Sequence, residues 1–260
     1  MKKILFLLAS LPLLCACSNI ADDEMLIYVE PELAKRTILL EDFTGQRCVN
    51  CPKATDIIEQ LQEEYGDNIV AVGIYSGEFG KLPNGNLLPL TTETGCEYFN
   101  HYVAGYGQPI GMVNRHEPMN HTDWTTTIRS EISKSSPIEI SLTAAIKDNN
   151  IEISIHENDI SEAITGKLQV WVLEDNITAF QFMPDGSSNK DYIHNHVFRT
   201  TVNGTWGEDI TLNEGEQKTQ TMSQPIANEW NKDNLSIVAF IYNNDGVLQA
   251  AKTKVNNKLK

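Results

Sequence analysis

The first half of the chain combines apolar runs with a segment of helical spacing. Residues 37–40 and 69–74 are short apolar runs typical of buried strands. Between them, Ile57, Ile58 and Leu61 recur at the spacing of one helix face. The order strand, helix, strand is typical of two parallel strands joined by a crossover helix, so this half predicts an α/β unit.

The rest of this half predicts a loop followed by three further elements. Residues 77–95 are rich in Gly, Pro, Asn and Thr, which favours a loop or an inserted lid. The expected elements are a short helix over 97–104, a strand over 110–114 and a closing helix over 124–133. We therefore expect an α/β domain over residues 36–134 with an insertion near residues 77–104.

Beyond Pro137 the apolar residues alternate with polar ones, as in half-buried strands. The strands that this pattern predicts lie at 138–146, 151–155, 168–173, 197–202, 235–242 and 247–255. Short strands with no helical period predict an antiparallel, immunoglobulin-like β-sandwich over residues 137–260. The predicted fold class is thus α/β plus all-β, with the boundary at residues 135–137.

The N-terminus predicts export and a lipid anchor. Residues 1–16 have a cationic start and an apolar stretch too short to cross a bilayer, as in a signal peptide. Leu14-Cys15-Ala16-Cys17 resembles the lipobox of bacterial lipoproteins, which implies a lipid on Cys17 and a tether over residues 17–35. The alternative is an ordinary cleavable signal in which these cysteines are incidental.

The net charge of the chain limits the kinds of partner that it can bind, and the residue after Cys17 indicates its membrane location. Loss of the signal removes Lys2 and Lys3 and lowers the formal charge from −15 to −17. Such a surface repels phosphate backbones, so nucleic acid is excluded as a partner. By resemblance to lipoprotein sorting, Ser18 favours the outer membrane. The expected location is therefore a lipid anchor in the outer membrane, facing the periplasm or the cell surface.

Two cysteines three positions apart, Cys48 and Cys51, are open to three interpretations. A zinc site needs four ligands, and only Cys96 and scattered histidines could complete it. An inert disulfide would close too small a loop to restrict the unfolded chain much. In a redox pair between a strand and a helix, an exposed Cys48 at the helix start would attack, and a more buried Cys51 would resolve the mixed disulfide.

The segment Asp42 to Cys51 resembles the active-site segment of thioredoxins, in which a strand carrying Asp-Phe leads to CxxC. This resemblance implies that Asp42 is the buried proton acceptor for the resolving thiol. Gln108-Pro109 resembles the loop whose cis-proline faces the cysteines, which implies that Pro109 holds an extended peptide substrate. Arg47 and Val49-Asn50 depart from the thioredoxin pattern, so the direction of exchange stays open.

The mature chain is also similar to a Bacteroidetes lipoprotein family related to the twenty-eight-kilodalton outer-membrane protein. The resemblance rests on Glu41 to Gly45, Cys48 to Pro52, Val113 to Arg115, Tyr192 to Arg199 and Val247 to Ala251, among others. It implies a thioredoxin-like N-terminal domain, a C-terminal sandwich and an outer-membrane location.

Two functions remain open at this point. In one, a Cys48–Cys51 disulfide takes part in thiol–disulfide exchange on exported proteins that carry thiols or disulfides, as an oxidoreductase without a cofactor. In the other, the protein is a non-enzymatic surface-binding or adhesion lipoprotein and the disulfide is structural. His194 and His196 lie two positions apart, in a further strand or at a strand edge, so their imidazoles would point the same way. Hydrogen bonding is the simpler role for them, and we assign no metal site.

Overall fold

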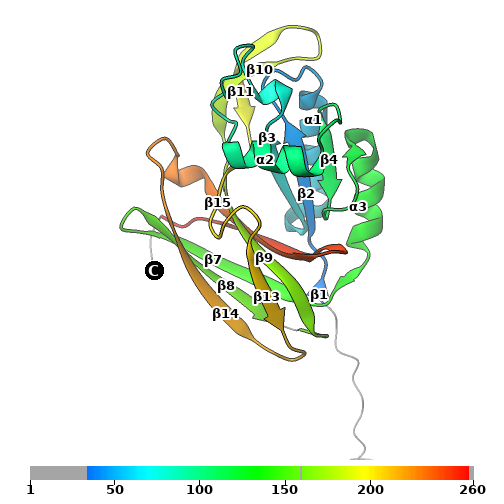
Figure 1. The fold of residues 1–260 in the computed structure, drawn as a ribbon, viewed down its shortest axis with the longest axis vertical. Helices are drawn as coiled ribbons and strands as arrows, with labels where there is room; N and C mark the ends of the chain where they lie inside the picture. Colours follow the sequence, from blue (N-terminus) through cyan, green and yellow to red (C-terminus); the bar gives the residue numbers. More distant parts are fainter. Residues whose placement is uncertain (1–33, 159, 258–260) are drawn as a thin grey trace, which may run out of the picture. The chain divides into compact units, whose positions relative to one another are not determined.

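The predicted strand–helix–strand unit begins the fold in a computed structural model that describes residues 34–158 and 160–257 (Figure 1). Strand β2 (Ile38–Thr44) is followed by helix α1 (Cys51–Tyr65), a single 3-10 turn, η1 (Gly66–Asn68), and strand β3 (Ile69–Tyr75). Strands β2 and β3 pair in parallel, as the pattern predicts. The signal peptide, Cys17 and nearly all of the tether lie outside the described residues.

Helix α1 packs on one face of these strands through its apolar side. Ala54, Ile58 and Leu61 are buried against a face that also carries Ile38 and Leu40. Because side chains alternate along a strand, this is the face of β2 on which Asp42 also lies. The helix thus covers a carboxyl group as well as an apolar core.

The remainder of the first half supplies the insertion and the edge of the sheet. Its elements are η2 (Glu78–Gly80), α2 (Glu93–Tyr102), β4 (Ile110–Val113), β5 (Met119–Asn120), η3 (His121–Asp123) and α3 (Trp124–Ile132). Helix α2 starts earlier than predicted, because the Thr92 hydroxyl accepts the Gly95 amide and caps it. Strand β4 pairs antiparallel with β2.

The second half consists of strands in several sheets, as its period-two pattern predicts. The strands are β7 (Glu139–Lys147), β8 (Asn150–Asn158), β9 (Ile164–Glu174), β10 (Ile177–Phe182), β11 (Ser188–His194), β12 (Val197–Thr201), β13 (Glu208–Leu212), β14 (Lys218–Pro225), β15 (Leu235–Asn243) and β16 (Gly246–Lys254), with the 3-10 turn η4 (Lys232–Asn234). Strands β14, β8 and β7 form a three-stranded sheet, while β10 and β11 form a separate hairpin. The fold is therefore mixed α/β, with most of its elements strands.

One nine-stranded sheet crosses the position at which the sequence predicts a domain boundary. Its order is β16-β15-β9-β12-β3-β2-β4-β5, with β13 also paired to β9. The junction is the parallel contact of β12 with β3, where the Gly73 amide donates to the His196 carbonyl at 2.8 Å. Residues 135–137 thus mark a change of strand pattern within one compact unit, not the edge of a sheet.

The junction around the boundary is reinforced at two places. Strand β1 (Ala34–Lys35), at the end of the predicted tether, pairs with β6 (Ser135–Ser136). In addition, a buried ion pair joins Arg115 to Glu41, with Nε and Oε1 3.3 Å apart. The Arg115 guanidinium lies 4.3 to 5.5 Å from four aromatic rings, those of Tyr102, Trp171, Phe240 and Tyr242.

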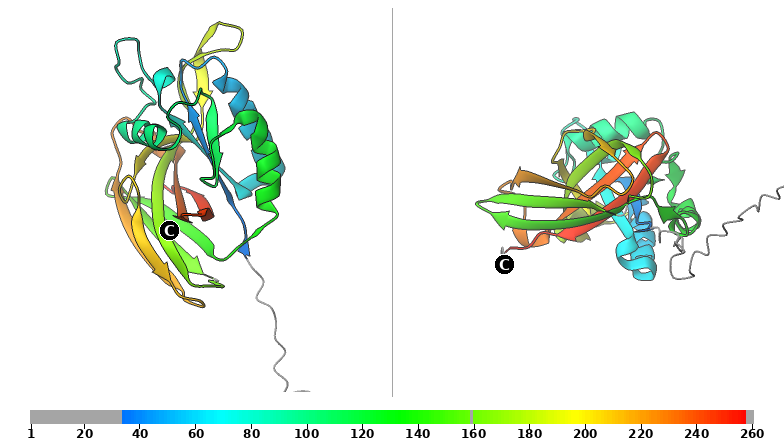
Figure 2. Two further views of the ribbon diagram at one scale, coloured as in Figure 1. Left: turned by 45° about the vertical axis from the view of Figure 1, so that its right-hand side comes forward. Right: turned by 90° about the horizontal axis from the view of Figure 1, so that it is seen from below.

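Among the described residues, no helix combines the length and the apolar character that a membrane span requires. The three sheets and the hairpin are seen from two further directions in Figure 2.

Candidate functional site

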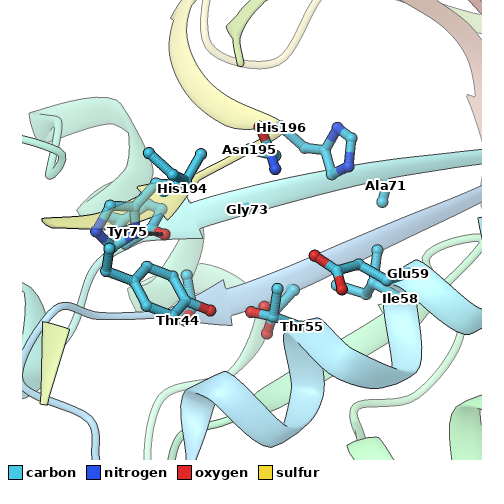
Figure 3. Close-up of a pocket in the computed structure, with 13 residues that line it drawn as sticks. Thr44, Thr55, Ile58, Glu59, Ala71, Gly73, Tyr75, His194, Asn195 and His196 are labelled. Carbon is cyan, nitrogen blue, oxygen red and sulfur yellow. Dashed lines mark hydrogen bonds between the residues drawn. The ribbon is translucent and has the colours of Figure 1, made fainter. Parts of the chain in front are cut away.

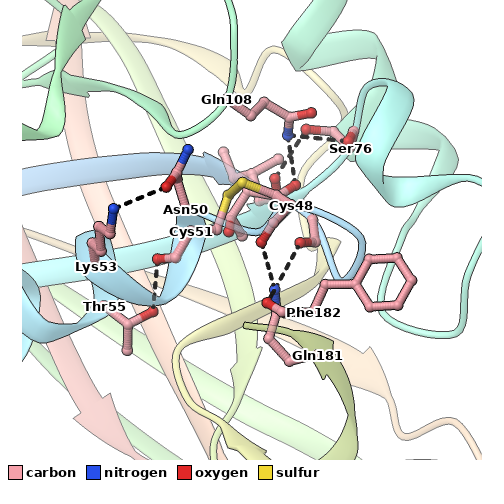
Figure 4. Close-up of a disulfide and its surroundings, with 12 residues drawn as sticks. Cys48, Asn50, Cys51, Lys53, Thr55, Ser76, Gln108, Gln181 and Phe182 are labelled. Atoms are coloured by element: carbon pink, nitrogen blue, oxygen red, sulfur yellow. Dashed lines mark hydrogen bonds between the residues drawn. A yellow bond between two sulfur atoms is a disulfide. The ribbon is translucent and has the colours of Figure 1, made fainter. Parts of the chain in front are cut away.

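The two cysteines lie on a tight turn between β2 and α1, as the sequence predicts. The Cys48 amide donates to the Gly45 carbonyl at 3.0 Å, and Cys51 is the first residue of the helix. Pro52 suits the first turn of a helix, where its missing amide hydrogen has no intrahelical partner to lose. Cys48 and Cys51 form a disulfide (Figure 4).

Both cysteines are buried, so the prediction of an exposed Cys48 is wrong. Cys48 is 1 % exposed and Cys51 is 2 % exposed. The β10–β11 hairpin forms part of the cover, because its Gln181 side-chain amide donates to the Cys48 carbonyl at 2.9 Å and to the Gly45 carbonyl at 3.3 Å (Figure 4). These bonds tie together segments more than 130 residues apart in the sequence.

The inserted loop holds the other side of the same turn. The Arg47 amide donates to the Phe79 carbonyl at 3.1 Å, and its guanidinium donates to the Lys81 carbonyl at 2.7 Å. The cysteine turn and the inserted loop approach so closely that a Cβ atom on Gly45 would lie 2.5 Å from the Phe79 carbonyl carbon. Arg47, the residue that departs from the thioredoxin pattern, thus fastens the insertion to the cysteine turn.

Asp42 lies under α1, the helix whose first residue is Cys51. Its residue is 3 % exposed, and its Oδ1 atom has no hydrogen-bond partner among the described residues. Burial raises the pKa of the Asp42 carboxyl to about 8. A carboxyl with such a pKa is mainly protonated near neutral pH, and its smaller ionised fraction is basic enough to accept a proton from a thiol.

A small cavity opens beside Asp42 (Figure 3). Its volume is about 30 Å³, which is room for about two water molecules. Its walls include Asp42 and Tyr75 from the sheet, Thr55 and Glu59 from α1, and Tyr192 and His194 from β11. The cavity thus supplies a polar, largely enclosed space next to a carboxyl group that the protein leaves without a partner.

His194 belongs to this cavity wall as a neutral group. Its Nδ1 atom lies 2.7 Å from the Tyr75 hydroxyl. Burial lowers the pKa of His194 to about 4 and raises the pKa of Tyr75 well above its usual value, so neither ring is charged at neutral pH.

His196 lies outside the strand and has other partners. Strand β11 ends at His194, and His196 has a positive φ of 56°. Its ring contacts Asp175 at 3.0 Å and Gln62 at 3.0 Å. The expectation that the two imidazoles point the same way is therefore wrong. Within residues 34–158 and 160–257, no group of three or more His, Cys, Asp or Glu is arranged to hold a metal ion.

The proline loop lies at the same end of the sheet. The Gln108–Pro109 peptide bond is cis, as predicted. The Gln108 side chain donates to the Thr44 carbonyl at 2.7 Å and to the Ser76 carbonyl at 3.1 Å, just where β2 and β3 end (Figure 4). The structure therefore brings the Cys48–Cys51 turn, Asp42 and the Pro109 loop to one end of the sheet.

The third cysteine of the described residues, Cys96, is a free thiol and lies half-buried on α2. Burial raises its pKa, which keeps it protonated and poorly nucleophilic.

The comparisons with known proteins concern the fold and the family. A sequence model of the family described as "Outer membrane protein Omp28" matches residues 97–259, a range that begins after the cysteine pair. No curated protein matches the sequence.

Three solved structures are similar to the chain. HBP35 of Porphyromonas gingivalis is 16 % identical, with a TM-score of 0.66 over 87 % of this chain and 78 % of that one. Protein AGR_C_4864 from Agrobacterium tumefaciens is 18 % identical, with a TM-score of 0.52 over 88 % and 97 % of the two chains. A domain of the outer membrane lipoprotein Omp28 from Porphyromonas gingivalis is 24 % identical, with a TM-score of 0.36 over 48 % and 92 %. The first two similarities show a shared fold.

Proposed function

The chain belongs to the Omp28 family of outer membrane proteins, and from that premise we propose that it carries out thiol–disulfide exchange on other exported proteins. The predicted outer-membrane location is confirmed by this family. In the proposal, Cys17 carries the lipid that holds the protein there. The part formed by β2, α1, β3 and β4 is thioredoxin-like and carries the reaction, while the strands beyond residue 137 form an immunoglobulin-like sandwich.

The observation that carries the proposal is the buried, unpartnered carboxyl of Asp42 beneath the helix that starts at Cys51. Burying an ionisable group without a partner costs free energy, so a fold that needs only a structural disulfide gains nothing from it. A resolving thiol, in contrast, must lose its proton before it can attack. With a pKa of about 8, the ionised form of Asp42 binds a proton more strongly than an ordinary carboxylate does and can accept it from the thiol.

The exchange proceeds in two balanced steps. The Cys48 thiolate of the reduced protein attacks a disulfide of the substrate, which forms a mixed disulfide and releases one substrate thiolate. The Cys51 thiol then gives its proton to the ionised carboxylate of Asp42 and attacks the Cys48 sulfur, which releases the second substrate thiolate and forms the Cys48–Cys51 disulfide. Two electrons pass to the substrate, and a dithiol donor reduces the protein again. Pro109 holds the substrate backbone beside Cys48.

The burial of both cysteines favours the alternative function, a surface-binding protein with a structural disulfide. A disulfide that the β10–β11 hairpin shields from solvent is poorly accessible to a second protein. In this alternative, replacing both cysteines by serine leaves the binding of a partner intact, and the pair takes no part in exchange.

Trapping of a mixed disulfide separates the two functions. A Cys51→Ser chain cannot resolve, so it should retain exported proteins in bonds that a reducing agent releases. The matched control is the Cys48→Ser, Cys51→Ser double variant, which keeps Cys96 and should retain nothing. Equal retention by both variants, together with no reduction of insulin by the wild-type protein, would contradict the exchange function.

A further inference from the structure

Exposed apolar side chains gather around the cysteine turn. Among the described residues, seven large apolar side chains are well exposed. Five of them lie on this turn, on the loop of residues 79–87 bonded to it, or at Phe182, whose amide is also bonded to it. These five, which we name the collar, are Val49, Phe79, Leu82, Leu87 and Phe182, with exposures between 36 % and 43 %. Exposed apolar groups that cluster in this way mark an interaction surface.

The backbone places the collar on both sides of the disulfide. On one side, the Phe79 carbonyl accepts the Arg47 amide, and a bridge between Lys81 and Leu87 closes the loop that presents the leucines. On the other side, the Phe182 amide donates to the Gln46 carbonyl at 2.9 Å. Figure 2 shows this loop and the β10–β11 hairpin projecting at the same end of the unit, where α1 begins.

The hairpin is attached to this site by few contacts. In the described sheets, β10 and β11 pair only with each other, and a two-stranded hairpin has little stability of its own. Besides the Phe182 amide, it is held to the turn by the Gln181 amide and by a bond from the Gln46 side chain to the Phe180 carbonyl at 3.1 Å. Each such bond is readily exchanged for one to water. The base of the hairpin is held to the sheet by the bond between His194 and Tyr75 and by the packing of Ile177 and Ala179, so it is the tip of the hairpin that can move away from Cys48.

We propose that the collar is a docking surface for extended, apolar segments of unfolded exported polypeptides, and that docking moves the tip of the β10–β11 hairpin away from Cys48. The proposal rests on the exchange function and names its substrate class. A partner for Cys48 must present a cysteine next to side chains that an apolar collar can bind. Folded proteins bury such side chains, whereas unfolded ones expose them together with their cysteines.

Binding of an unfolded polypeptide without free thiols tests the docking surface. The probe is reduced, carboxymethylated α-lactalbumin, and native α-lactalbumin is its folded control. The full oxidised chain should bind the unfolded probe with a negative heat-capacity change, the mark of apolar burial. Phe182→Ser combined with Leu82→Ser should raise Kd at least about tenfold, which corresponds to about 1.4 kcal/mol.

Ile193→Ser is the matched control, because Ile193 is equally exposed and lies near the base of the same hairpin. It should leave Kd within about twofold, a change of less than about 0.5 kcal/mol. Absence of binding by the wild-type chain, or equal losses in the collar and control variants, would overturn the docking surface.

Hydrogen exchange tests the movement of the hairpin. With the probe bound, the Phe182 amide should exchange faster, while the amides of β9 stay protected. Unchanged or slower exchange at Phe182 would overturn the displacement. Since the probe has no free thiol, these results do not depend on redox chemistry. Binding without trapping by Cys51→Ser would count against the exchange function alone, and trapping without binding would count against the docking surface alone.

Discussion

At the scale of single residues, the proposed exchange depends most on Asp42 and Gln181. Asp42 is buried under α1, and Gln181 donates to the Cys48 carbonyl. In the proposal, Asp42 accepts the proton of Cys51 and Gln181 helps to keep Cys48 from solvent. Each role predicts a different change when the side chain is replaced.

Replacing Asp42 by asparagine should change how stability depends on pH. The native carboxyl has a pKa of about 8, whereas an unfolded aspartate has one of roughly 3.9. Between these values only the native state keeps the proton, so the free energy of unfolding falls as pH rises from about 4 to about 8. Asp42→Asn removes this titration. In urea unfolding, the free energy of unfolding of Asp42→Asn minus that of wild type should therefore increase from about pH 5 to about pH 8. A difference that does not change with pH would contradict a buried carboxyl with a raised pKa.

Replacing Gln181 by alanine should expose the disulfide. The change removes the hydrogen bonds to the Cys48 and Gly45 carbonyls, each worth roughly 1 kcal/mol, so opening becomes more frequent. Reduction by dithiothreitol should accelerate by about fivefold if one bond limits opening and by about thirtyfold if both do. Gln220→Ala, which removes a glutamine bond to Glu157 on the three-stranded sheet, is the control and should leave the rate unchanged. An equal rate in both variants would show that the hairpin is no cover.

The sequence predicts part of this site and misses the rest. The local sequence is enough to find three parts of the site. Cys48 and Cys51 form a CxxC pair, Asp42 lies shortly before it, and Pro109 lies in a recognisable turn. Gln181 gives no such signal, because its contact with Cys48 depends on how a distant hairpin folds back. For the same reason the sequence suggests an exposed Cys48 where the structure has a buried one.

At the scale of elements, helix α3 and strand β4 meet so closely that only glycine fits between them. A Cβ atom on Gly111 would lie 2.5 Å from the Trp124 ring and 2.8 Å from the Glu41 carbonyl oxygen. This contact sets the edge of the sheet beside the Pro109 loop.

Gly111→Ala should therefore destabilise the protein by about 1–3 kcal/mol, as overpacking of a core does. Gly107→Ala is the matched control, because a Cβ there meets no atom within 4 Å. Its effect should stay within about 0.5 kcal/mol. Thermal unfolding of the two variants measures the difference, and equal stabilities would show that α3 and β4 do not pack this closely.

The elements that the sequence predicts are those with a strong apolar pattern. Strands β3, β7 and β15 are found nearly to the residue, because apolar residues repeat at the right period. Strand β14 (KTQTMSQP) is missed, and strand β11 (SNKDYIH) is predicted only at its end, around His194, because few of their residues are apolar. Pairing with a neighbour, not apolar pattern, makes these segments strands.

At the scale of the whole molecule, the nine-stranded sheet joins the two halves of the chain, which the sequence separates near residues 135–137 by a change in the spacing of apolar residues. The sequence does not predict the contact of β12 with β3, because the spacing of apolar residues within a strand does not tell which distant strand it pairs with. The ion pair of Arg115 with Glu41 depends on this union, since Trp171 and Phe240 come from the second half.

A fragment of residues 34–136 should therefore not fold by itself. It loses the neighbour of β3 and three of the four rings around Arg115, those of Trp171, Phe240 and Tyr242, which leaves apolar surface and a buried ion pair exposed. Circular dichroism should show no cooperative unfolding of the fragment, while residues 34–257 unfold cooperatively. A cooperative transition in the fragment would support two independent domains, with a boundary near residues 135–137.

The reduction potential of the Cys48–Cys51 pair, measured in the full chain by equilibration with dithiol–disulfide buffers, tests the exchange function most directly. Exchange proteins such as thioredoxin have potentials of about −270 mV or higher, whereas structural disulfides of secreted proteins have potentials below about −300 mV. A carboxyl that accepts the Cys51 proton and a cover that can open predict a value above about −300 mV. A value below about −300 mV would contradict the exchange function and leave the pair a structural disulfide.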